Sequence, residues 1–341
     1  MNLLNTLFVT TQGSYVHKDG ENVIVSLEHK EQMRVPVHRL SAVLCFGNVT
    51  VSPFLLEWCV ERSLHFAMLT EKGRFLGRYE GLASGGALLR REQYRLASDE
   101  EQARRIASFI VRGKIKNSIC FLRRGARERT GEAAEMLSKA TDAVTRLEPS
   151  LSEATTIDQI RGYEGEAAAL YFGTIDALVI VDDATLRFER RSRRPPRNAF
   201  NALLSFGYAM LLNDCIAALQ AVGLDPWTGF LHVEHPGRPS LALDLMEEFR
   251  AYTIDRMILA LINRKQIASA DFESDPAGGV TLKDGARKTF LSEYQTRKGR
   301  EIQHPLLEQP IPAGLLPHVQ ARLLSRVIRG DLDEYPPFVF R

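Results

Sequence analysis

Carboxylates and imidazoles gather within residues 229–250, GFLHVEHPGRPSLALDLMEEFR. Asp244 lies three residues before Glu247 and four before Glu248, so a helix over LALDLMEEF places these acids on one face. His232 lies upstream in the apolar segment GFLH, and Ser240 is placed to cap the helix. Charges buried without partners are costly, so such acids need a compensating charge from a lysine, an arginine or a metal ion.

A second acid lies in the stretch RGYEGEAAALYF, residues 161–172. Its small residues predict a helix that packs closely against another helix, and Glu164 lies among them, three residues after Arg161. If this helix packs beside LALDLMEEF, then Glu164, His232 and Glu247 meet, and Asp244 lies within reach. Acids and an imidazole from separate segments would then surround one point.

Two or three carboxylates with one imidazole suit an oxygen-preferring divalent cation, magnesium or manganese (Mg²⁺ or Mn²⁺), better than a structural zinc. Such an ion activates an oxygen nucleophile and neutralises charge on a phosphoryl group, which is the chemistry of phosphodiesters. Arginine clusters at RGARER (124–129), RRSRRPPR (190–197) and RKGR (297–300) provide positive surfaces for a polyanion. We assign DNA binding to Arg161, Arg193, Arg194, Arg197 and Arg238.

Spacing alone leaves a plainer interpretation open for each of these residues. The three acids of LALDLMEEF can instead lie on a solvated face and pair with Arg250. His232 can be a hydrogen-bonded core residue, and Glu164 a surface acid that faces Arg161. RRSRRPPR can be an exposed loop without a ligand, and His235 a loop residue.

The composition is that of a soluble globular protein. With 341 residues the chain is long enough for two domains, and 45% hydrophobic and 25% charged residues exclude disorder and coiled coil. We find no uncharged run of about 18 residues for a membrane helix and no basic secretory start, so we expect a cytoplasmic protein and no membrane partner. Cys45, Cys59, Cys120 and Cys215 form no C-x-x-C pair, which indicates core thiols in a reducing compartment.

The hydrophobic period divides the chain and predicts an α+β fold. Residues 1–80 contain short apolar runs separated by turn signals, which predict a small antiparallel, β-sandwich-like domain with one helix at SPFLLEWCVERS that starts at Ser52 and Pro53. GLASGG (81–86) is a linker, and residues 87–341 have the helical period of an all-α domain. The segment DLDEYPPFVFR has no strong pattern and is an interface segment or a loose end.

Three blocks of the sequence, in order, resemble a known family. They are RGYEGEAAALYF, FERRSRRPPRNAFNALLSFGYAMLL (188–212) and GFLHVEHPGRPSLALDLMEEFR. The chain resembles the CRISPR-associated spacer-acquisition integrase, the Cas-one family, and in particular its type I-C subgroup. The β-then-α organisation agrees with the family across nearly the whole chain.

The resemblance implies roles for individual residues. Glu164 is the glutamate of R-G-x-E-G, His232 the histidine of G-F-x-H and Glu247 the second acid of D-x-x-E, and these positions coordinate a catalytic divalent metal in the family. Asp244, the first acid of that pattern, supports or joins the site. Some relatives have Asp where this chain has Glu247.

The resemblance also implies the reaction and the partners. The family joins short DNA duplexes, called prespacers, to the repeat of a CRISPR array by transesterification, in which a 3′-hydroxyl attacks a phosphodiester, and it has associated endonuclease activity. His232 would be a neutral ligand, so low pH should inhibit. The implied partners are a second copy of the chain, which forms a homodimer through the β domains, a Cas-two dimer and, in type I-C relatives, a Cas-four nuclease. A stand-alone nuclease for branched or single-stranded DNA and a non-catalytic DNA-binding scaffold remain the alternatives.

Overall fold

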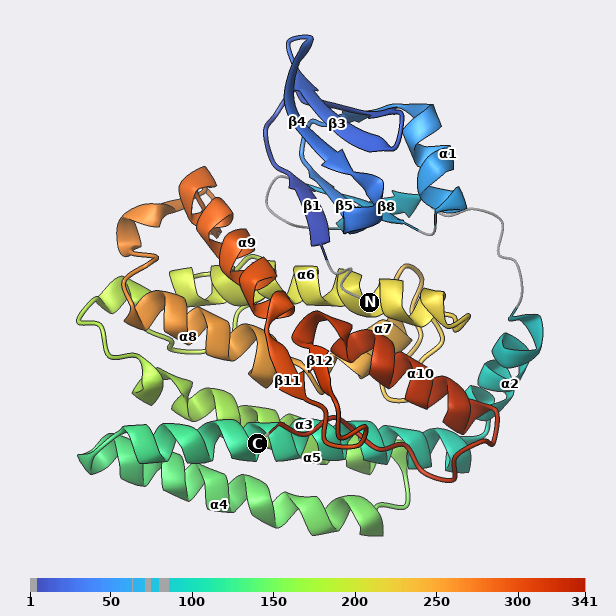
Figure 1. Cartoon of the computed structure of the whole chain (residues 1–341). Helices are drawn as coiled ribbons and strands as arrows, with labels where there is room; N and C mark the ends of the chain where they lie inside the picture. The colour runs from blue at the N-terminus through green and yellow to red at the C-terminus, as the bar shows by residue number, and fades with distance from the viewer. Residues whose placement is uncertain (1–4, 63, 71–74, 80–85, 341) are drawn as a thin grey trace. The chain divides into compact units, whose positions relative to one another are not determined.

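The computed structural model describes residues 5–62, 64–70, 75–79 and 86–340. They form two compact units. The first consists of the described residues before Gly86 with segments 291–301 and 312–315, and the second of residues 86–290 and 302–311 and the residues from Leu316 onward. The N-terminal part is built of β-sheets and the following part is mostly helical, which confirms the α+β class (Figure 1). The predicted linker 81–86 lies outside the described residues except for Gly86.

Two four-stranded sheets make up the N-terminal part. One has the strand order β1 (Asn5–Val9), β5 (Leu40–Phe46), β7 (His65–Leu69) and β8 (Phe75–Tyr79). The other has the order β4 (Lys30–Pro36), β3 (Asn22–Leu27), β2 (Tyr15–Asp19) and β6 (Thr50–Val51). The apolar runs predicted the strands of this part except β2 and β6; β2 has a polar sequence, YVHKD, and β6 has only two residues.

Strand direction differs in part from the antiparallel expectation. The pairs β2–β3, β3–β4 and β7–β8 are antiparallel, whereas β1–β5, β5–β7 and β2–β6 are parallel. The chain passes from β5 to β7 through β6 and helix α1 (Pro53–Glu61), and a crossover of this kind returns the strand in the same direction. Alternating short runs do not encode this direction, so the sequence pattern could not predict it.

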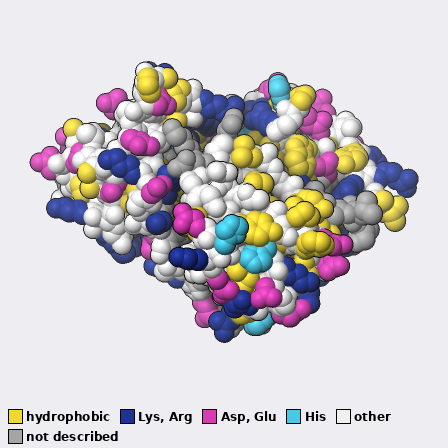
Figure 2. Space-filling model, turned by 90° about the horizontal axis from the view of Figure 1, so that it is seen from above, with side chains coloured by type: hydrophobic (Ala, Val, Ile, Leu, Met, Phe, Trp, Pro, Cys, Tyr) yellow, Lys and Arg dark blue, Asp and Glu magenta, His cyan; other side chains and the backbone are white. Residues whose placement is uncertain are grey.

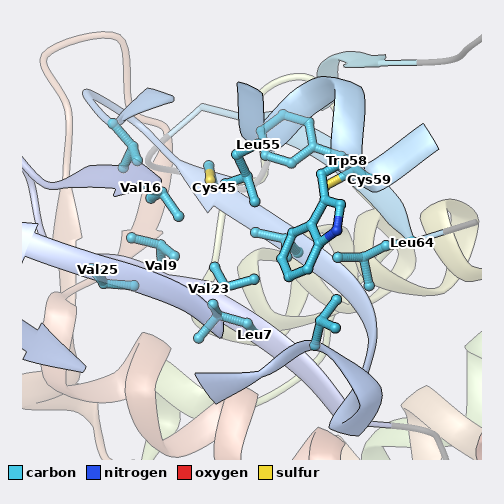
Figure 3. Close-up of a cluster of buried hydrophobic side chains, with 14 residues drawn as sticks. Leu7, Val9, Val16, Val23, Val25, Cys45, Leu55, Trp58, Cys59 and Leu64 are labelled. Carbon is cyan, nitrogen blue, oxygen red and sulfur yellow. The ribbon is translucent and has the colours of Figure 1, made fainter. Parts of the chain in front are cut away.

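The apolar faces of these strands bury one cluster beneath α1. Leu55 and Trp58 of α1 are 0% and 2% exposed and pack with Val23, Cys45 and other apolar side chains (Figure 3). Ser52 stands at the N-cap and Pro53 at the first helical position as predicted, although the Ser52 side chain makes no capping hydrogen bond. Burial of these apolar side chains stabilises this part of the chain.

The helical part contains helices from 7 residues (α7) to 29 residues (α3) in length, and long connections precede α6 and α7. The helices are α2 (Ala87–Ser98), α3 (Glu100–Glu128), α4 (Gly131–Glu153), α5 (Ile157–Thr174), α6 (Ala199–Ala221), α7 (Ser240–Met246), α8 (Arg256–Asn263), α9 (Asp284–Gly299) and α10 (Leu316–Ile328). Short strands form two further pairs that the helical period did not predict, β9 (Phe272–Ser274) with β10 (Val280–Leu282) and β11 (Glu301–Gln303) with β12 (Pro310–Pro312). Short 3-10 turns η1, η2, η3, η5 and η6 cover residues 37–39, 175–178, 184–186, 269–271 and 313–315.

Side-chain caps fix where the helices that frame the site begin. Asp99 accepts hydrogen bonds from two backbone N–H groups at the start of α3, and Thr156 with Gln159 forms a capping box at the start of α5. Asn198 caps α6 through the Asn201 N–H. Helix α3 packs along both α4 and α5, and these helices lie side by side in Figure 1.

Helix α7 is shorter than predicted and starts differently. The predicted cap by the Ser240 side chain is not seen, because Pro239 holds the N-cap position and Ser240 Oγ donates instead to the Val233 carbonyl at 3.1 Å. After Met246 the chain makes a turn and then a π-helical segment, η4 (Arg250–Asp255), which leads into α8. Glu247 follows the end of α7, but its backbone stays helical and its N–H donates to the Asp244 carbonyl at 3.1 Å, so the two acids share the side that faces His232, as predicted. Glu248 does not share that side and contacts Tyr335 and Phe338 instead.

Helix α6 is the most apolar long element of this part. By length and composition alone it could cross a membrane, but 72% of its apolar window is buried inside the protein. Gly207 lies where an added Cβ would be 2.6 Å from Ile254, so α6 and η4 approach closely. The helix is the centre of the second unit's core.

Residues 335–340 are buried or half-buried, so the loose-end alternative for DLDEYPPFVFR is wrong. Tyr335, Phe338 and Phe340 are 1%, 2% and 7% exposed. Asn117 of α3 donates from Nδ2 to the Phe338 carbonyl at 2.8 Å and accepts from the Phe340 N–H at 3.0 Å. These bonds fix the segment against the middle of α3.

Acidic and basic side chains are interspersed on the face shown in Figure 2, in keeping with a net charge of only +2. Any positive surface for a polyanion must therefore be local, and the arginines around the site described next are its strongest candidates.

Candidate active site

Helix α5 presents Glu164 from the middle of its length. Ile160, Ala167 and Tyr171 are buried, whereas the Glu164 side chain is 26% exposed and faces a cavity. The close packing predicted for the glycines of this helix is not seen, because a Cβ added at Gly162 or Gly165 would meet no atom within 4 Å. Gly162 and Gly165 are exposed and three residues apart, so they lie on the solvent face of α5.

His232 is placed by a loop that wraps around the Asp244 carboxylate. Asp244 is fully buried and accepts the backbone N–H groups of Phe230, Leu231 and His232 at 2.7, 3.0 and 2.9 Å. Gly229 permits this approach, since an added Cβ would lie 2.8 Å from Asp244 Oδ2. Asp244, the first acid of the D-x-x-E pattern, therefore holds the loop that carries His232 in its conformation.

The same carboxylate orients the imidazole. His232 Nδ1 lies 2.6 Å from Asp244 Oδ1. Because an ionised carboxylate only accepts hydrogen bonds, Nδ1 carries the proton and donates, and the neutral ring keeps a lone pair on Nε2. Asp244 therefore acts on the site through His232, and its side chain is not among those lining the cavity.

Glu247 lies at the end of α7, 4% exposed, between two cations. Its Oε1 lies 2.9 Å from Arg250 Nη2, and its Oε2 lies 2.7 Å from Lys114 Nζ, without hydrogen-bond geometry at Oε2. Burial raises the pKa of Glu247, but attraction to Arg250, Lys114 and His232 outweighs burial and holds it well below the ordinary value. The solvated-face interpretation of this acid is wrong, although its pairing with Arg250 is present.

Glu164, His232 and Glu247 line one cavity of about 340 Å³. His232 Nε2 and Glu247 Oε1 are 3.7 Å apart, and Lys114 Nζ contacts both Glu164 Oε1 and Glu247 Oε2. The structure thus brings together residues from α5, from the loop before α7 and from the end of α7. Among the described residues, no three His, Cys, Asp or Glu side chains stand close enough to hold a metal ion in this conformation.

The five arginines assigned to DNA divide into two groups. Arg161, Arg193 and Arg238 line the cavity. Arg161 also donates to Asp158 and to the Leu231 carbonyl, so it braces the loop of the histidine. Arg194 and Arg197 are exposed on the loop before α6, where Arg197 donates to the Ala277 carbonyl at 2.7 Å. His235 is an exposed loop residue, as the alternative for it expected.

Several cavity residues were missed by sequence reasoning. Lys114, on helix α3, is the most important, and the signal that could have found it is a lysine four residues after Ile110 and three after Val111, on the apolar side of a predicted helix. The opposite wall holds Asp255, which accepts from the hydroxyls of Tyr171 and Tyr208 at 2.7 Å each. Burial raises the pKa of Asp255 to about 6, although these hydrogen bonds and Arg250 act to lower it.

Two guanidinium groups complete this wall. Arg250 lies over the Tyr208 ring at 4.8 Å and Arg191 at 5.7 Å from the ring centroid. Burial lowers the pKa of Arg191 to about 10, because its charge is partly removed from water. The cavity therefore holds acids and cations in close contact, because Arg250 pairs with Glu247 and further arginines line the same space.

Comparison with known proteins identifies the family. The family model for CRISPR associated protein Cas1 matches residues 7–296. The chain belongs to the Cas1 family. It is 49% identical over 339 residues to CRISPR-associated endonuclease Cas1 1 of Chlorobaculum tepidum and 45% identical over 340 residues to that of Moorella thermoacetica, with 99% of each chain covered in both cases.

Other Cas1 relatives differ in how their chains are arranged. A CRISPR-associated exonuclease Cas4/endonuclease Cas1 fusion of Rhodospirillum rubrum is 36% identical over 335 residues, which are 97% of this chain and 57% of the fusion. The fused form therefore contains a Cas1 part that corresponds to nearly the whole of this chain.

Solved structures share the fold of this Cas1 chain. A CAS1 protein from Thermotoga maritima has a TM-score of 0.82 at 24% identity and covers 96% of this chain and 97% of its own. A casposase bound to integration product has a TM-score of 0.84 at 20% identity, with 99% and 95% covered. A chain of a Cas6-RT-Cas1–Cas2 complex has a TM-score of 0.82 at 24% identity, with 98% of this chain and 36% of that chain covered.

Proposed function

We propose that this Cas1 protein is the metal-dependent DNA integrase of CRISPR spacer acquisition, with associated endonuclease activity. In the reaction a prespacer 3′-hydroxyl attacks a phosphodiester of the CRISPR repeat, and the repeat strand's own 3′-oxygen leaves. The observation that carries the proposal is the convergence of Glu164, His232 and Glu247 on one arginine-lined cavity. The 49% identity to an endonuclease Cas1 over the whole chain supports it.

The donors of the cavity fit a hard divalent cation. Glu164 and Glu247 supply carboxylates and His232 supplies the Nε2 lone pair, while the buried Glu247 Oε2 accepts no hydrogen bond of ordinary geometry. We propose Mg²⁺ or Mn²⁺ as the ion. When bound, it would activate the attacking oxygen and offset charge on the phosphoryl group.

The protein's own residues orient the reactants. Asp244 holds His232 with Nε2 toward the cavity, and Arg161 braces the carbonyl side of the same loop. Arg193 and Arg238 on the cavity wall bind the phosphate backbone and set its register.

A nuclease that uses water in place of the 3′-hydroxyl is the second candidate, since the same cavity serves both nucleophiles. A labelled prespacer incubated with the protein, a Cas2 partner, the divalent ion and an array plasmid separates them. We expect covalent joining of label to plasmid. Cleavage without joining would leave a nuclease, and DNA binding without either would leave a non-catalytic scaffold.

We further propose the assembly in which the protein works. The partners are prespacer and repeat DNA, a second copy of this chain, a Cas2 dimer and a Cas4 nuclease, supported by the Cas1–Cas2 complexes and the Cas4/Cas1 fusion among the related proteins. Residues 1–80 mediate dimerisation, 81–86 are the linker and 87–341 carry catalysis. The three sequence blocks support a type I-C assignment, and the predicted compartment is the cytoplasm.

A further inference from the structure

Lys114 occupies the place between the two carboxylates of the site. It lies on α3, and its side chain is only 14% exposed. Its Nζ contacts Glu164 Oε1 and lies 2.7 Å from Glu247 Oε2. A lysine therefore binds one oxygen from each of the two acids that the proposed ion requires.

We propose that Lys114 is an internal counter-cation that competes with the divalent ion for Glu164 and Glu247 and thereby sets the metal affinity of the site. The inference rests on the proposed function, because it takes these acids as metal ligands. In the metal-free protein the Lys114 ammonium holds the carboxylates, and metal binding requires its Nζ to leave them.

The charges around the cavity support competition. Glu164 and Glu247, the two acids that the proposed ion requires, already contact two cations, Lys114 and Arg250, and further arginines line the cavity, so no surplus negative charge is left there for a divalent ion. A divalent ion added while Lys114 stays would stand beside an ammonium group at close range in a partly buried site. Like charges so placed repel strongly, so the two cations exclude each other.

Lys114, rather than Arg250, is the cation that leaves. The Arg250 side chain is largely buried, stacks on Tyr208 and pairs with Glu247. Lys114 has a flexible stem, lines the cavity and holds both acids. Its ammonium group can swing into the cavity and remain available to a DNA phosphate, whereas the stacked guanidinium is held in place by the ring beneath it.

The test measures Mn²⁺ binding by electron paramagnetic resonance on the full chain, without DNA. Lys114→Met should bind Mn²⁺ at least about 10-fold more tightly than the unmodified protein, because one positive charge is gone from the site. Lys114→Gln, which keeps a polar group there, should behave the same way if the methionine variant folds poorly. Lys114→Arg, which keeps the charge, should show no gain.

One result would overturn competition by Lys114, and a different result would overturn the proposed metal site on which it rests. If the unmodified protein binds Mn²⁺ and Glu247→Gln abolishes this binding, but the folded Lys114→Met and Lys114→Gln variants bind no more tightly, competition by Lys114 is wrong. If Glu247→Gln leaves Mn²⁺ binding unchanged, the proposed metal site itself is wrong. Thermal melting of every variant in chelator shows whether it is folded.

Discussion

Glu247 and Glu248 are neighbours in the chain and similarly deep, at 4% and 0% exposed, yet they have opposite partners. Glu247 faces the cavity and two cations, which hold its pKa well below the ordinary value even though burial raises it. Glu248 faces neutral donors: Gln320 Nε2 at 3.0 Å, the Phe338 N–H at 2.6 Å and the Tyr335 hydroxyl. Burial raises the pKa of Glu248 to about 8, against the effect of these hydrogen bonds.

The pair shows that burial alone does not decide the charge of an acid. Cations keep a buried carboxyl ionised, as a metal ligand must be, whereas neutral donors leave it protonated near neutral pH. Glu247 is therefore ionised and can bind a cation, whereas Glu248 holds the segment that contains Tyr335 and Phe338. The predictions below test this division.

The largest effect is expected on the cavity side. Glu164→Ala, His232→Ala and Glu247→Ala should each reduce joining by about 10³-fold or more, because each removes a group that stabilises the transition state. DNA binding, measured by fluorescence anisotropy, should persist. Glu166→Ala, at an exposed position of the same helix as Glu164, is the matched control and should keep full activity. Normal joining by any of the first three variants would remove that residue from the site.

Substitutions of Glu248 should change the free energy of unfolding and not the chemistry of the cavity. Glu248→Ala leaves the Tyr335 hydroxyl and the Phe338 N–H without their acceptor and removes one of the acceptors of Gln320, and should lower the free energy of unfolding by about 2–4 kcal/mol. Glu248→Gln mimics the protonated acid, so it should cost less than about 1 kcal/mol and keep joining activity. Urea unfolding measures both. Equal destabilisation by the two changes would contradict a neutral Glu248.

Asp255 is a third buried acid, and its raised pKa makes the stability of the protein depend on pH. Its pKa is raised from 3.8 to about 6 in the folded protein by burial, so between these values the folded state binds its proton more strongly than the unfolded state. The contribution of Asp255 to stability therefore falls as pH rises from about 4 to 6, by on the order of 2 kcal/mol. Asp255→Asn should remove this part of the slope, as followed by urea unfolding across that range in chelator. An unchanged slope would assign Asp255 an ordinary pKa.

The smallest effect is expected from the exposed loop before α6. Charge reversal at Arg193 and Arg194 should weaken DNA binding several-fold and reduce the slope of log K against log salt by about 1 to 2. The measurement is a DNA titration at several salt concentrations. The same reversal at Arg95 and Arg329, two exposed arginines outside the basic clusters, serves as the control. If the slope does not change, the loop is a solvated surface without a DNA role.

The sequence predicted the helices and strands more accurately than it predicted which of them, and which residues, contact one another. The change of hydrophobic period predicted sheets followed by helices, and Glu164, His232 and Glu247 were chosen by residue type and spacing. The direction of β5 against β7 was not predictable, because alternation is the same in parallel and antiparallel strands. Lys114 was missed because its contacts with Glu164 and Glu247 span 50 and more residues, and local patterns carry no signal over such separations.

Asp244 shows a second limit. Its spacing to Glu247 indicated a shared helix face, and both acids do lie against His232, but Asp244 accepts the backbone N–H groups of the His232 loop and does not line the cavity. Only the close approach at Gly229 makes that loop possible. Residue type and spacing predicted that Asp244 lies beside the site. Its role, which is to hold the loop of His232, depends on tertiary contacts that the sequence does not reveal.

The anchoring of Glu248 by Phe338 joins residues separated by 90 positions in the chain. During synthesis Glu247 leaves the ribosome long before the segment that holds its neighbour in place. A nascent chain synthesised only as far as Glu248 therefore contains Glu164, His232, Asp244 and Glu247. It still lacks the segment around Phe338 that contacts Glu248. The protein should therefore acquire its ability to act on DNA only after the segment that contains Phe338 has left the ribosome.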